Sequence, residues 1–64
     1  MSKTNNYGLS TETLQKALEY MKSEGYMEPT NTTDDLISFT RSMVEDIPFM
    51  VKAKITQWAS HLEK

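Results

Sequence analysis

The sequence predicts an all-α fold, a small three-helix domain whose last two helices form a hairpin or a kinked pair broken at Pro48. Two observations carry this prediction. From Leu36 to Leu62 the apolar residues recur at helical spacing. Pro48 falls inside this stretch, where a helix interior would lose a hydrogen bond and clash with the preceding turn, at a cost of roughly 3 kcal/mol. Proline is tolerated in the first turn of a helix, so we expect a corner just before Pro48.

The first helix is predicted near Ser10–Glu24. Ser10 suits the N-cap, and Leu9 before it can pack onto Leu14 as a hydrophobic staple. Gly25 suits the left-handed residue that ends a helix. The apolar positions of this helix, which share one face at spacing i, i+3, i+4, i+7, are Leu14, Ala17, Leu18 and Met21.

The second helix is predicted over Thr32–Asp46. Pro29 prevents the first helix from continuing, and Thr32 or Thr33 is expected to cap the second. Acidic residues then follow at the positive end of the helix, where they are favourable: Asp34 and Asp35. We expect an inward face made of Leu36, Phe39, Met43 and Val44, with Ile37 to its side.

The third helix is predicted over Pro48–Glu63. Its apolar stripe consists of Val51, Ile55, Trp58 and Leu62, widened by Ala59, and Trp58 is expected to be buried. Opposite charges favour an antiparallel arrangement of the last two helices. The second carries Asp34, Asp35, Glu45 and Asp46 against Arg41, and the third carries Lys52, Lys54 and Lys64 against Glu63.

Length and composition limit the classes of function. The chain has 64 residues, which suggests one domain over residues 9–64 behind a flexible polar tail over residues 1–8. It has no cysteine and one histidine, His61, and no nucleophile–base constellation, so we expect neither an enzyme nor a metal or other cofactor. No apolar run is long enough for a membrane span, and no small-molecule substrate is expected. A cytoplasmic protein fits these features best.

The apolar residues exceed what three short helices can bury. After the helical stripes are assigned to a core, several large side chains remain, and their excess predicts a protein interface. The predicted interface residues are Ile37, Phe39, Phe49, Met50 and Trp58. An alternative is that the corner before Pro48 folds Phe49 and Met50 inward beneath the first helix.

A second interpretation is a small DNA-binding regulator. Two helices joined by a short turn are similar in outline to a helix-turn-helix, with Pro48–Leu62 as the reading helix. The candidate phosphate contacts are Arg41, Lys52 and Lys54. The reading helix begins with Phe49 and Met50 where polar base-contacting groups belong, and the net charge of −2 disfavours nucleic acid.

The sequence therefore predicts a non-enzymatic interaction module that acts through an apolar helical surface. Its partner would be another protein or a second copy of the chain. Its small size, polar start and lack of a chemical motif are typical of regulatory or accessory proteins of bacteria or bacteriophages. The helix-turn-helix interpretation is the alternative.

Overall fold

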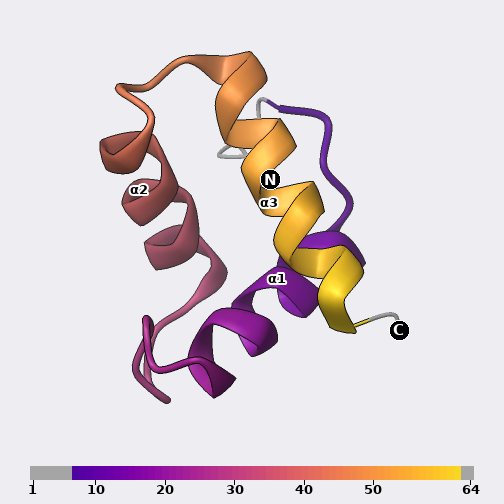
Figure 1. Cartoon of the computed structure of the whole chain (residues 1–64), viewed down its shortest axis with the longest axis vertical. Coiled ribbons are helices and arrows are strands. Elements are labelled where there is room, and N and C mark those ends of the chain that lie inside the picture. Colours follow the sequence, from indigo (N-terminus) through magenta and orange to yellow (C-terminus); the bar gives the residue numbers. More distant parts are fainter. Residues whose placement is uncertain (1–6, 63–64) are drawn as a thin grey trace.

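The computed structural model describes residues 7–62, and the fold within this range is all-α. The helices are α1 (Thr11–Ser23), α2 (Thr33–Met43) and α3 (Pro48–Leu62). Figure 1 shows α2 and α3 side by side in opposite directions, joined at the top, with α1 crossing near the other end. Among the helix pairs, α1 packs most extensively against α3. The predicted fold class is confirmed, whereas most of the predicted tail and Glu63 lie outside the described residues.

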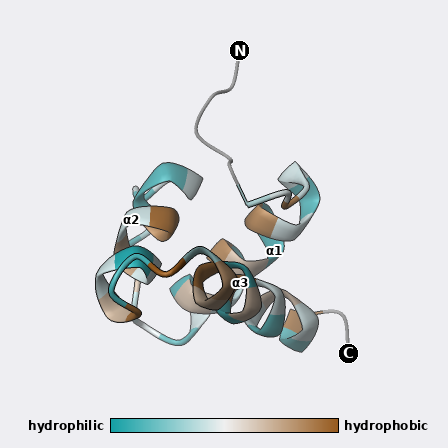
Figure 2. Ribbon diagram, turned by 90° about the horizontal axis from the view of Figure 1, so that it is seen from above, coloured by the Kyte–Doolittle hydropathy of each residue, from teal (hydrophilic) through white to brown (hydrophobic). Residues whose placement is uncertain are grey.

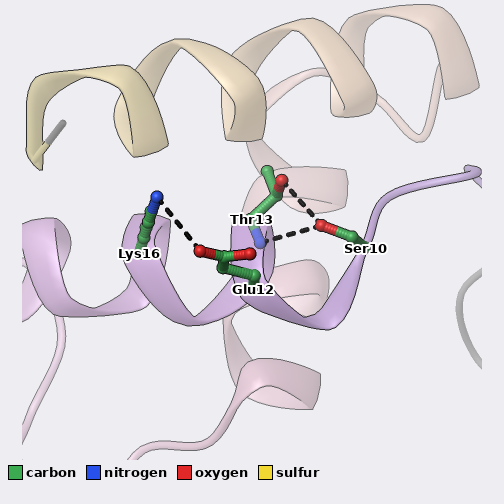
Figure 3. A network of polar contacts seen from close by, with 4 residues as sticks. All are labelled: Ser10, Glu12, Thr13 and Lys16. Atoms are coloured by element: carbon green, nitrogen blue, oxygen red, sulfur yellow. Dashed lines mark hydrogen bonds and ion pairs between the residues drawn. The ribbon is translucent and has the colours of Figure 1, made fainter.

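The start of α1 is fixed by its cap. The backbone N–H of Thr13 donates to the Ser10 hydroxyl at 3.1 Å, and that hydroxyl donates to Thr13 Oγ1 at 2.9 Å. Glu12 and Lys16 form an ion pair at 3.4 Å one turn further on (Figure 3). Ser10 therefore satisfies a donor that the first helical turn leaves without a partner, as the sequence predicts.

The end of α1 follows the expected glycine pattern. Gly25 has a φ of +87°, a left-handed conformation that a side chain would strain. Its N–H donates to the Lys22 carbonyl at 3.1 Å, and the Tyr26 N–H donates to the Met21 carbonyl at 2.9 Å. These two bonds satisfy carbonyls of the last helical turn and send the chain back toward α2.

The start of α2 is a reciprocal capping box. The Asp35 N–H donates to the Thr32 hydroxyl at 3.4 Å, and the Thr32 N–H donates to Asp35 Oδ2 at 2.8 Å. The side-chain amide of Asn31 donates to the same carboxylate oxygen at 3.2 Å. The Thr32 N–H, and then the Asn31 amide, hold the pKa of Asp35 below its ordinary value because they stabilise the charged form.

Because of this capping box, the stability of the folded protein depends on pH. Because the pKa of Asp35 is lower in the folded state, its stabilisation is present above about pH 4 and is lost as the pH falls through the folded value. We expect Asp35→Asn to show a smaller loss of stability than the wild type between pH 6 and pH 3, measured by urea unfolding. Asp34→Asn, outside the capping box, is the control. Equal losses in wild type and Asp35→Asn would contradict the assignment.

The corner between α2 and α3 begins earlier than predicted. The helix ends at Met43 rather than Asp46, because Glu45 and Asp46 both have a φ of +58°. The Asp46 N–H donates to the Arg41 carbonyl at 2.7 Å, which closes the end of α2. The Arg41 side chain then holds the Asp46 carboxylate through two bonds of 2.8 and 3.1 Å. The corner is therefore a full reversal and not a shallow kink, and Pro48 opens α3.

All three helices contribute to the buried core. Figure 2, in which the molecule is seen from above, shows apolar segments on each of the three helices. The buried apolar residues are Leu9, Leu14, Ala17, Leu18, Met21, Met27, Leu36, Ile37, Val51, Ile55 and Ala59. All four stripe positions of α1 are thus confirmed, and Leu9 joins Leu14 in the same cluster.

The buried face of α2 is rotated about the helix axis relative to the face that the sequence predicts. Met43, expected in the core, is 47% exposed, whereas Ile37 and Thr40 are buried. The Thr40 hydroxyl donates to the Leu36 carbonyl at 2.8 Å, which satisfies it without water. A threonine that bonds within its own helix can be buried at little cost, and hydrophobicity alone gives no sign of this.

The stripe of α3 is confirmed in its middle and wrong at its end. Val51, Ile55 and Ala59 are buried, and Trp58 is only partly buried. Leu62 is 45% exposed in the last turn of α3. Ala59 takes the inward position there, because a small side chain lets two helices approach closely.

Candidate functional site: two surfaces of α3

The predicted interface residues do not form one patch. Ile37 belongs to the core, Phe39 and Trp58 are half-buried, and Phe49 and Met50 are exposed at the start of α3. Ile37 is 6% exposed, so the prediction that it contributes to a surface is wrong. The rotation of α2 that buries Thr40 also carries Ile37 inward. The remaining four residues fall on two separate surfaces.

The first surface is the outer face of α3, which we call the Phe49 face. Phe49 is 78% exposed, so the corner does not fold its ring inward. A shallow hollow of about 500 Å³ runs from this ring along the helix. Its lining residues recur every three or four positions: Phe49, Lys52, Ala53, Thr56, Gln57 and Ser60. Met50, which is 40% exposed, lies beside this face in the first turn.

The second surface is a groove of about 270 Å³ between the three helices, which we call the aromatic groove. Its lining residues are Tyr20, Met21, Tyr26, Phe39, Met43, Lys54 and Trp58. The ring centroids of Phe39 and Trp58 lie 6.4 Å apart and the ring planes are inclined at 36°, which makes a tilted aromatic contact between α2 and α3. The Tyr20 ring is stacked on the His61 ring, with the centroids 4.6 Å apart and an angle of 10° between the planes. His61 therefore packs against a side chain that lines the groove.

Tyr20 and Tyr26 were not predicted as site residues. Tyr20 lies one position off the core stripe of α1, and Tyr26 follows the glycine that ends the helix. A signal was present, since both tyrosines lie close in sequence to the end of α1. Their meeting with Trp58 depends on the crossing of α1 and α3, which the sequence pattern does not specify.

The two surfaces lie on roughly opposite sides of α3. Phe49, Ala53 and Ser60 share one face, whereas Lys54 and Trp58 occupy positions about half a turn away. A substitution on one surface therefore leaves the other in place.

The candidate phosphate contacts are dispersed. Arg41 is bound to Asp46 at 2.8 Å, and the bonds between them raise the pKa of Arg41 and lower that of Asp46. Lys52 lies on the Phe49 face and Lys54 lines the aromatic groove. The three cations do not share one face.

The acidic pairs also have structural roles. Asp35 belongs to the capping box and Asp46 to the corner. Among residues 7–62, no group of three or more His, Cys, Asp or Glu side chains could hold a metal ion. The helices in this range include none long and apolar enough to cross a membrane.

Comparison of the chain with protein-family models, with curated proteins and with solved structures gave no match.

Proposed function

We propose that this protein is a non-enzymatic interaction module, regulatory or accessory in role, that docks another protein chain on the Phe49 face. The observation that carries the proposal is the 78% exposure of Phe49 beside its hollow of about 500 Å³. A large aromatic ring in water is costly, and desolvating such a ring is what anchors many protein interfaces.

The neighbours of Phe49 suit a helix-packing contact. Ala53, Thr56 and Ser60 are small and follow one another along the helix, so a partner backbone can approach closely. Lys52 and Gln57 stand beside them and supply a polar rim. A stable interface needs about 800 Å² per partner, roughly a fifth of the 4246 Å² of accessible surface of this chain. The Phe49 face together with exposed Met50 and Ile47 offers the centre of such an area.

Phe49→Asp tests the proposal. The substituted position lies in the first turn of α3, where an acidic residue is favourable, so the helical content by circular dichroism should remain. We expect the variant to lose at least ten-fold in affinity for its partner, the loss typical of a buried aromatic anchor. Tagged wild type and variant are used for pull-down from a lysate of the source organism with and without nuclease, and self-association is measured by sedimentation.

Leu62→Asp is the matched control, because it places the same charge on another exposed apolar residue of α3 that lines neither the Phe49 face nor the aromatic groove. The proposal predicts protein species, or dimers, that wild type and Leu62→Asp retain and Phe49→Asp loses. Identical species and sedimentation for all three proteins would contradict it. Partners that disappear with nuclease would favour the DNA-binding alternative, for which the placement of Arg41, Lys52 and Lys54 offers no support.

A further inference from the structure

We infer that the aromatic groove is a second binding site, which takes the C-terminal residue of a partner polypeptide: one large apolar side chain with its free carboxylate. The site is separate from the Phe49 face and does not depend on the function proposed for that face. The inference rests on the size of the groove, on its aromatic lining and on the charge it presents.

The size of the groove suits a single large side chain. The volume of about 270 Å³ lies just below the range of about 300–1,000 Å³ typical of pockets for drug-sized ligands. Phe39 and Trp58 form one wall and Tyr20, braced by His61, stands in another. Met21 and Met43 add side chains that adapt to the shape of an apolar guest.

The charge of the groove lining favours an anionic occupant. Lys54 is the charged residue in the lining, where no acidic side chain is present. Among the described residues, Lys54 has no ion-pair partner. The lining also carries the indole N–H of Trp58, which only donates hydrogen bonds, and the hydroxyls of Tyr20 and Tyr26. A carboxylate complements this set, whereas a second cation would meet Lys54 with repulsion.

The compactness of the groove favours a chain terminus over an acidic side chain. In a C-terminal residue, the carboxylate and the side chain branch from the same carbon atom. One small groove can then accommodate both groups. An internal acidic residue would bring its carboxylate on a separate side chain and would require a longer channel.

The test uses the full-length ¹⁵N-labelled protein and three synthetic peptides, followed by NMR chemical shifts. The peptides are acetyl-Ala-Phe with a free carboxylate, its C-terminal amide, and acetyl-Asp-Phe amide, whose only carboxylate is on a side chain. We expect saturable shifts at the Trp58 indole N–H with the free acid. Both amides should bind about five-fold more weakly, the ratio given by an ion pair of about 1 kcal/mol.

Substitutions locate the effect. Lys54→Gln should bind the free acid as weakly as the amide, and Lys54→Arg should retain the preference for the acid. Lys52→Gln on the Phe49 face is the matched control and should bind like the wild type. Phe49→Asp should also bind the peptide normally, which separates this site from the proposed docking face.

Three results would overturn the inference. Equal affinity for the free acid and its amide would remove the role of the carboxylate. Saturable shifts that avoid Trp58, or that are unchanged in Lys54→Gln, would place binding elsewhere. Acetyl-Asp-Phe amide binding as tightly as the free acid would show that the groove does not select a chain terminus.

Discussion

Replacing Ile55 with alanine should destabilise the protein more than removal of any exposed side chain of α3. Ile55 is fully buried in the middle of α3, in the same cluster as residues of α1 and α2. Its truncation removes apolar contacts and leaves a cavity, at a cost of about 2–5 kcal/mol. For a domain of this size that loss lowers the melting temperature by roughly 10 °C or more. Thermal unfolding followed by circular dichroism measures it.

Gln57→Ala is the control for this variant. Gln57 lies on the same helix but in the exposed hollow of the Phe49 face. Its substitution should change stability by no more than about 0.5 kcal/mol. If the two variants melt at the same temperature, Ile55 is not at the centre of the core.

Replacing Ala17 with leucine should destabilise the protein by the opposite mechanism. Ala17 is fully buried on α1, the helix that packs most extensively against α3. Because protein interiors are close-packed, we expect leucine at this completely buried alanine to push the helices apart. Overpacking of this kind costs about 1–3 kcal/mol. Urea unfolding would detect the change as a lower midpoint.

Gln15→Leu serves as the control for Ala17→Leu. It introduces the same side chain two positions away on the exposed side of α1, where no packing opposes it. An Ala17→Leu variant as stable as Gln15→Leu would mean that the α1 interface accommodates volume and is not tightly packed.

The helix starts could be predicted from sequence because local chemistry specifies them. Ser10 and Thr32 bond to backbone N–H groups three residues away, and Pro48 is excluded from a helix interior. Gly25 likewise ends α1 through its own conformation. None of these signals depends on what the rest of the chain does.

The faces of α2 could not be predicted in the same way. Hydrophobicity places Met43 inside and gives no reason to bury Thr40, yet the structure has the reverse. The bond from Thr40 to the Leu36 carbonyl removes the cost of burying the hydroxyl. Similarly, nothing in the sequence predicts the left-handed conformations of Glu45 and Asp46, and α2 ends earlier than predicted as a result.

Of the candidate site, the exposure of two residues could be predicted. The apolar stripes of the three helices fill the core without Phe49 and Met50, and both side chains are exposed, whereas their role in an interface stays a prediction. The division into two surfaces was not predictable, since it depends on how α1 crosses α3 and brings Tyr20 toward Trp58. The position of Lys54 in a groove was not predictable either, because it follows from packing between helices.

The uneven packing of the three helices has a consequence for local opening. Because α1 and α3 pack most extensively against each other, we expect α2 to detach at a lower free energy than that of global unfolding. Phe39 and Met43, which line the aromatic groove, belong to α2 and would leave with it. A ligand in the groove would therefore bind only the closed form and slow amide exchange along α2, so that occupancy of the groove would raise the stability of the domain against opening.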